Sequence, residues 1–258
     1  MIKNTNISIN WCKDFFIELI KKELIIQYKH TRFGFFWAII SPLIQMIVIG
    51  TIFSFFIKTP NYYLILLTAL LPWNFFSSSV SASPQAFLNN RNLIKKARLP
   101  YLLIPLSKLT ANFIQLIINF LILLFIIFLS ELKIQPHNLI FLGISLLWLF
   151  ILSSSLSIFL STANIFSRDV DFIIKQLMQI IFYASPIVYQ IKHIPSKIIS
   201  LFYLNPLTSI ISLIRMSLLN QSLVSNTIIL GNTIVTLLII ITSLIIYLKK
   251  KDYIVDKI

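Results

Sequence analysis

The stretch LTANFIQLIINFLILLFIIFLS, residues 109–130, decides the class of this protein, because it contains no charged side chain from its first residue to its last. An α-helix rises about 1.5 Å per residue, so about 20 apolar residues span the roughly 30 Å hydrocarbon core of a bilayer. Inside that core a helix satisfies its own backbone hydrogen bonds. The sequence therefore predicts a transmembrane helix over these residues.

Similar apolar runs recur along the chain, which is 57% hydrophobic and 12% charged, against about 25% charged in soluble domains. Four further segments are long enough to span, and another qualifies if Lys175 extends its ammonium group to the headgroups. The predicted spans are 33–57, 62–82, 109–130, 138–163, 172–191 and 228–248. The predicted fold class is therefore all-α integral membrane, with six transmembrane helices.

The basic residues predict the orientation of these spans. If the N-terminus is cytosolic, seventeen of the 22 Lys and Arg residues lie in cytosolic segments and five lie in outer segments. Lys and Arg are retained preferentially on the cytosolic side of a membrane protein. We therefore expect a multi-pass protein of the cell inner (plasma) membrane with both termini in the cytosol.

The segments outside the spans subdivide a single predicted membrane domain, 1–258. Residues 1–32 are cytosolic and contain an amphipathic helix suited to the headgroup plane, although Glu23 interrupts its apolar stripe. Residues 89–100 form a short basic cytosolic helix or an ordinary positively charged loop. Residues 192–227 are too broken to span, so they form re-entrant half-helices on the outer side or a surface hairpin. The six-span bundle covers 33–248, and 249–258 is a cytosolic tail.

The residue types that the expected spans lack disfavour several classes of membrane protein. No Asp, Glu or His lies in a span interior, whereas carriers driven by protons or sodium usually place such groups at mid-membrane. The serines have no base or acid at their depth, so hydrolase activity is disfavoured. The four glycines form no phosphate-binding loop, and the single Cys12 excludes an intrachain disulfide and a cysteine zinc cluster. We expect a transporter without a metal, driven by another polypeptide.

Aromatic residues near the span ends admit two interpretations. Membrane proteins generally place aromatic belts at the two interfaces. Alternatively, aromatic faces stack on sugar rings while nearby serines, such as those at 77–79, bind hydroxyl groups. Sequence alone leaves both open. The candidate translocation-path residues are Phe36, Trp37, Tyr62, Trp73 and Phe76.

Three blocks, in order along the chain, resemble one known family. They are YKHTRFGFFW over 28–37 followed by Pro42, then KKARLP over 95–100 with LIPLS over 103–107, then RDV over 168–170, SPIVY over 185–189, Asn205-Pro206 and Arg215. The set is similar to the permease subunit of ABC-2 type exporters of O-antigen, capsular polysaccharide or teichoic acid. Gln27 and Arg32 depart from the family pattern, which affects the depth of the first span.

The resemblance implies a homodimer with the translocation path on its two-fold axis, each subunit docked on a cytosolic ATPase. Lipid-linked polysaccharide would be the substrate, and ATP and Mg²⁺ would bind to the ATPase, leaving this chain without a cofactor. The implied ATPase-coupling residues are Arg91, Lys95, Lys96 and Arg98, and the implied outer-gate residues are Pro186, Tyr189, Asn205, Pro206 and Arg215. Lys29 and Arg32 are the candidates for binding the lipid phosphate.

Two other functions fit parts of this pattern. A channel or lipid scramblase without an ATPase would equally lack charges within its spans. A membrane enzyme acting on lipid-linked sugars usually exposes a large outer loop with Arg, Asp or His, whereas the outer segment 192–227 contains only Lys192, His193, Lys197 and Arg215 as charged or imidazole groups. A copurifying ATPase distinguishes the exporter from both.

Overall fold

The computed structural model describes residues 9–29, 32–34, 36–96, 100–130, 132–191, 194, 202 and 204–257. All regular secondary structure within these ranges is helical. Five helical segments are long and apolar enough to cross a bilayer, and they coincide with five of the six predicted spans. The chain is therefore a multi-pass membrane protein.

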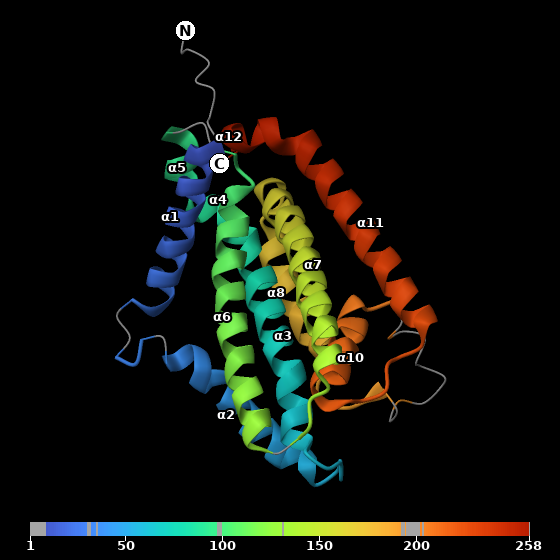
Figure 1. Cartoon of the computed structure of the whole chain (residues 1–258). Helices are drawn as coiled ribbons and strands as arrows, with labels where there is room; N and C mark the ends of the chain where they lie inside the picture. The colour runs from blue at the N-terminus through green and yellow to red at the C-terminus, as the bar shows by residue number, and fades with distance from the viewer. Residues whose placement is uncertain are drawn as a thin grey trace.

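The spanning segments contain α2 (Phe36–Ser54), α3 (Tyr62–Ala82), α6 (Leu103–Leu129), α7 (Leu139–Phe166) and α11 (Asn226–Lys250). Helices α3, α6 and α7 run along a common direction, whereas α2 and α11 are inclined to them (Figure 1). The short helices η1 (Ser83–Gln85) and α4 (Ala86–Asn89) extend α3, and η2 (Pro136–Asn138) precedes α7. Helix α6 begins before the predicted apolar run, and its first turn accommodates Pro105 because the first helical residues need no intrahelical donor.

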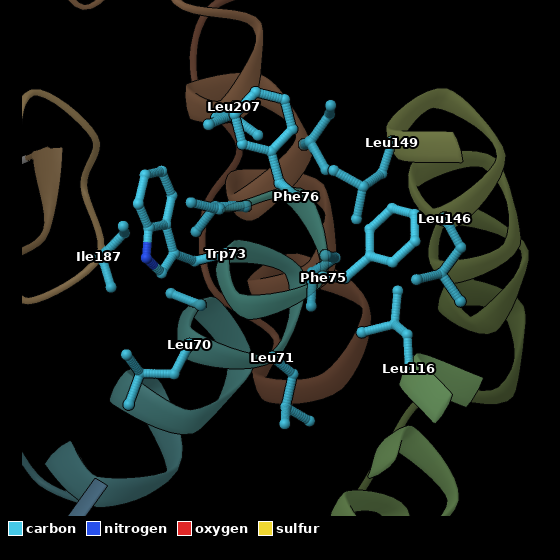
Figure 2. Packing of buried hydrophobic residues seen from close by; sticks show 14 of the residues in the cluster. Leu70, Leu71, Trp73, Phe75, Phe76, Leu116, Leu146, Leu149, Ile187 and Leu207 are labelled. Carbon is cyan, nitrogen blue, oxygen red and sulfur yellow. The ribbon is translucent and has the colours of Figure 1, made fainter. Parts of the chain in front are cut away.

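Helix α3 is the centre of the bundle, because it contacts α2, α6, α7, α8 and α10. Its side chains Trp73, Phe75 and Phe76 lie in the larger apolar cluster, surrounded by aliphatic residues of neighbouring elements (Figure 2). The labelled neighbours are Leu116, Leu146, Leu149, Ile187 and Leu207. The surrounding helices keep an outer apolar face, as Leu121, Phe125 and Phe128 of α6 illustrate. That exposed face is suited to lipid.

The sixth predicted span, 172–191, is helical only in its first part. Helix α8 (Asp169–Tyr183) has 15 residues, so it is about 22 Å long and shorter than the hydrocarbon core. The chain then turns, because Pro186 lacks a backbone N–H. The carbonyl oxygens at the end of α8 gain side-chain donors instead: the Asn205 amide bonds to Ala184 at 3.3 Å, and the Tyr189 hydroxyl bonds to Tyr183.

Helix α10 (Pro206–Leu219) lies within the predicted re-entrant segment 192–227, where residues 207–219 form the second predicted half-helix, and it is buried along nearly all of its length. It packs against α7, α3 and α11 near one end of the bundle (Figure 1). With 14 residues it is too short to cross a bilayer. Most of the first predicted half-helix, Ile198–Leu204, lies outside the described residues.

A second apolar cluster joins the helices at the opposite end of the bundle. Helices α1 (Ile9–Tyr28), α5 (Arg91–Lys96) and α12 (Ile254–Lys257) meet there (Figure 1). The cluster consists of Leu19, Phe87, Ile94, Ile104, Ile158, Ile165, Tyr247 and Ile254. Helix α1 therefore packs on the protein, chiefly on α6. Glu23, which interrupts its apolar stripe, lies 3.7 Å from the Lys108 ammonium and 4.0 Å from that of Lys22.

We predict that Leu19→Ala loosens α1, because the leucine side chain is buried in this cluster. The loss should be about 2–4 kcal/mol, measured by thermal unfolding of the purified protein together with hydrogen exchange of the α1 amides. Ile17→Ala on the same helix is the matched control, since Ile17 is exposed and its loss should change stability by less than about 0.5 kcal/mol. Equal effects of the two substitutions would contradict the packing of α1.

Candidate functional site

A groove without charged side chains lies between the end of α1, α2, α3 and α6, with a volume of about 340 Å³. Its polar lining consists of carboxamides and hydroxyls, and none of the described residues that line it is acidic or basic. The polar lining residues are Gln27, Ser41, Gln45, Asn74, Ser77, Ser78, Ser81, Asn112, Gln115 and Asn119. Such a concentration of amides and hydroxyls among apolar spans marks a candidate site.

Helical spacing explains how three apolar helices build a polar groove. On α3, Asn74, Ser77, Ser78 and Ser81 are three or four residues apart, so they share one face. The same spacing places Asn112, Gln115 and Asn119 on one face of α6, and Ser41 and Gln45 on one face of α2. The opposite face of α3 packs in the apolar core. The three polar faces therefore meet in the groove.

Hydrogen bonds between the amides cross the groove from helix to helix. The Asn74 amide donates to Gln45 Oε1 at 2.8 Å, and the Gln27 amide donates to Gln115 Oε1 at 3.1 Å. Asn119 donates to the Ala38 carbonyl of α2 at 3.2 Å. A carboxamide has two donors and an acceptor oxygen, so these groups retain capacity for a further partner. The arrangement suits a neutral ligand rich in hydroxyl groups and provides no acid or base.

A second groove, of about 380 Å³, lies beside the first along the same face of α3, against α8. It shares Ser77 and Ser81 with the first groove. The polar face of α3 therefore extends from the side that faces α2 to the side that faces α8. Lys175 is the charged residue among those that line it, and its ammonium lies 2.8 Å from Asp171. Burial alone would raise the pKa of Asp171, but hydrogen bonds from Lys175 and Gln85 outweigh it and lower the pKa. The Lys175 charge is thus balanced locally.

The structure places the five aromatic path candidates in different surroundings. Trp37 lines the first groove. Trp73 lines the second, where the centroid of its ring lies 5.4 Å from that of Phe182. Phe36 is exposed at the start of α2, whereas Tyr62 and Phe76 are buried in the apolar cluster. The amides of the groove are not among the residues predicted from the sequence. Their helical spacing within apolar spans was the signal that would have found them.

The candidates for ATPase coupling lie on and after α5. Arg91 and Lys95 are exposed, while Arg98 and the side chain of Lys96 lie outside the described part of the chain. The Lys22 ammonium of α1 donates to Asn90 Oδ1, just before α5, at 2.7 Å. The phosphate candidates Lys29 and Arg32 are exposed after α1. They follow Gln27, which lines the first groove, so they lie close to it along the chain.

The outer-gate candidates come together around the end of α8 and the start of α10. Asn205 donates to Ser185 Oγ at 2.8 Å, and its side-chain oxygen accepts the Leu207 N–H at 3.1 Å, which caps α10. Arg215 donates to the carbonyls of Ile187 and Tyr189 at 2.9 and 3.4 Å. Pro186 and Pro206 lie within the same segments and are buried. The segment after α8 is therefore held against α10.

Residues 15–219 match the family model of the ABC-2 type transporter. This chain belongs to that family. Two proteins of Klebsiella pneumoniae, each named O-antigen export system permease protein RfbA, are 30% identical to it over 206 and 208 residues, with coverage of 79% of this chain and 80% of each relative. A Myxococcus xanthus protein of the same name is 25% identical over 200 residues, or 76% of either chain. The ABC-2 chain described here is a membrane subunit of a transporter and not an enzyme.

We predict that Asn74→Leu impairs transport by the ABC-2 chain, because it removes the amide of α3 that bonds to Gln45 across the groove. A hydrogen bond contributes about 1 kcal/mol, so loss of this amide should weaken the binding of a hydroxyl-rich cargo about fivefold, and the transport rate at low cargo concentration should fall in proportion. Thr242→Leu on α11 is the matched control: its exposed hydroxyl bonds only to the Leu238 and Ile239 carbonyls of its own helix. Transport assays in vesicles that also contain the ATPase partner, ATP and Mg²⁺ compare the two variants, and equal rates would contradict a role for the groove.

Proposed function

We propose that this chain is the permease subunit of an ATP-driven exporter that moves lipid-linked polysaccharide of the O-antigen class across the inner membrane from the cytosol. The groove of carboxamides and hydroxyls along α3 is the observation that supports this cargo most directly. The names of the Klebsiella and Myxococcus relatives support the same assignment. Capsular polysaccharide and teichoic acid chains belong to the same chemical class of cargo.

The chemistry of a glycan fits the groove. Sugar rings present hydroxyl groups at their edges, which pair with carboxamides and serine hydroxyls, and apolar CH faces, which stack on aromatic rings. Trp37 and Trp73 are available for such stacking because each lines one of the two grooves. A path without net charge also avoids holding a neutral chain too tightly at one point. The cargo therefore slides past many weak contacts.

A second copy of the chain would complete the path. Ser41, Gln45 and Ser78 line the first groove and are exposed in the single chain. Lipid cannot satisfy such groups, so a groove open to hydrocarbon would be unfavourable. We therefore propose a homodimer in which α2 and α8 of the two copies enclose the polar faces of α3. In this arrangement α8 and the segment after it act as the sixth membrane-crossing unit, and α10 enters from the outer side.

The energy would come from a cytosolic ABC ATPase that holds ATP and Mg²⁺. Helix α5 is the proposed contact, since Arg91 and Lys95 are exposed and Ile94 anchors the helix in the second apolar cluster. Movement of α5 would reach α1 through the same cluster and through the Lys22–Asn90 hydrogen bond. Lys29 and Arg32 would meet the lipid phosphate at the cytosolic mouth of the groove.

Reconstitution tests the proposed dependence on an ATPase. Vesicles that contain this chain alone should move no more lipid-linked glycan than empty vesicles. Addition of the ATPase with ATP and Mg²⁺ should start transport, measured as protection of the glycan from an external glycosidase. Rapid movement without the ATPase would instead establish a channel or scramblase.

Charge reversal at the proposed coupling surface should uncouple the two subunits. In the double variant Arg91→Glu and Lys95→Glu, we expect stimulation of the ATPase by the permease to fall at least about fivefold, because replacing complementary charges at an interface with like charges slows and weakens association. Lys58→Glu and Lys133→Glu provide controls, since both lysines are exposed at the opposite end of the bundle. Full stimulation by the first double variant would place the ATPase contact elsewhere.

A further inference from the structure

Another polar cavity, separate from the groove, lies at the outer end of the bundle and has a volume of about 590 Å³. Its walls are the loop between α2 and α3, the segment after α8, α10, and the connection from α10 to α11. A cavity of this size is typical of small-molecule sites. Its polar lining includes Gln190, Thr208, Ser212, Arg215, Gln221 and Ser225.

One face of α10 provides the charged wall of this cavity. Thr208, Ser212 and Arg215 are spaced by four and three residues, so they lie above one another on the helix. Arg215 is only 4% exposed. Its two terminal nitrogens donate to the carbonyls of Ile187, Tyr189 and Ile65, at 2.9, 3.4 and 3.3 Å. The guanidinium is therefore fixed in position.

The positive charge of Arg215 lacks a counter-charge. Among the described residues no carboxylate forms an ion pair with it, and the sequence contains no Asp or Glu between Asp171 and Asp252. Carbonyl dipoles satisfy its terminal nitrogens, but the Nε–H has no acceptor within the described part of the chain. A buried cation is costly unless an anion or further hydrogen bonds compensate it.

Thr208 presents a second unpaired donor on the same wall. Its hydroxyl is buried and has no partner among the described residues. A helical threonine usually bonds to the carbonyl four residues earlier, but α10 begins at Pro206, so that position precedes the helix. Two buried donors on one cavity wall, one of them cationic, suit a ligand that is both an acceptor and an anion.

We infer that this outer cavity binds the phosphate group of a lipid headgroup. Guanidinium and hydroxyl donors are the groups that bind phosphate oxygens, and a bilayer supplies phosphate near the ends of its spanning helices. Both the phospholipids of the membrane and a polyprenyl pyrophosphate offer this chemistry. The inference does not rest on the proposed export function, because neither the groove nor the ATPase takes part in it.

Native mass spectrometry of the full chain tests this inference. The protein in a nonionic detergent is titrated with phosphatidylglycerol, with farnesyl pyrophosphate, and with diacylglycerol, which has no phosphate. We expect at least tenfold tighter binding of one or both phosphate compounds than of diacylglycerol. Retention of phosphatidylglycerol alone identifies a membrane phospholipid as the ligand, and retention of farnesyl pyrophosphate alone identifies a polyprenyl lipid. No preference over diacylglycerol overturns the inference.

Substitutions on α10 locate the binding. Arg215→Gln should weaken phosphate binding about tenfold, with Arg215→Lys in between. Arg215 also holds the segment after α8, so its loss could disturb the fold. Thr208→Val is therefore the decisive variant. The Thr208 hydroxyl makes no bond within the described chain, so the fold should persist while binding weakens about threefold. Ser217→Ala is the matched control, since that hydroxyl bonds to Ile214 and does not line the cavity. Equal affinities of Thr208→Val and Ser217→Ala would exclude this cavity as the site.

Discussion

Hydrocarbon offers no hydrogen-bond partners, and this constraint shapes every part of the molecule. Within the five long spans, the helices satisfy their own backbone groups. Where the chain departs from a helix after Tyr183, side chains from distant elements take over: Tyr62 donates to the Val188 carbonyl at 2.7 Å, and Arg215 donates to that of Ile187. The irregular segment is possible because α3 and α10 cover it. The buried polar residues around this segment, such as Arg215, thus have a structural role.

The same constraint explains which parts of the fold the sequence predicted well. Five spans were evident because long apolar runs have few alternatives in a membrane protein. The position of α10 was also evident, since Asn205-Pro206 and its short length allowed no crossing. The end of α8 was not evident. The apolar run continues past Tyr183, and the Asn205 amide that bonds to the Ala184 carbonyl comes from a distant part of the chain. The packing of α1 on α6 likewise depends on tertiary contacts such as Glu23 with Lys108.

The candidate site was predicted less completely than the fold. Ionisable groups and aromatic rings are the features of the sequence that indicate a function, and Trp73 and Phe76 are two of the aromatic candidates. Only the first of these reaches a groove, because the two side chains project differently into a crowded core. The carboxamides of α3 and α6 are not predicted as a site from the sequence, because a single Asn in a span usually indicates a contact between helices. Their meaning became clear when the fold placed Asn74 and Asn112 on the same groove.

The absence of net charge along the described lining of the first groove has a consequence for bioenergetics. A cargo of neutral sugars that passes such a lining moves no charge through the membrane field. The electrical potential therefore performs no work on it. For comparison, moving one elementary charge across the membrane changes the free energy by about 2.3 kcal/mol per 100 mV. Passage of the neutral sugar segment should therefore be indifferent to membrane voltage. A cell that loses its proton-motive force but keeps its nucleotide pool would still be able to translocate that segment.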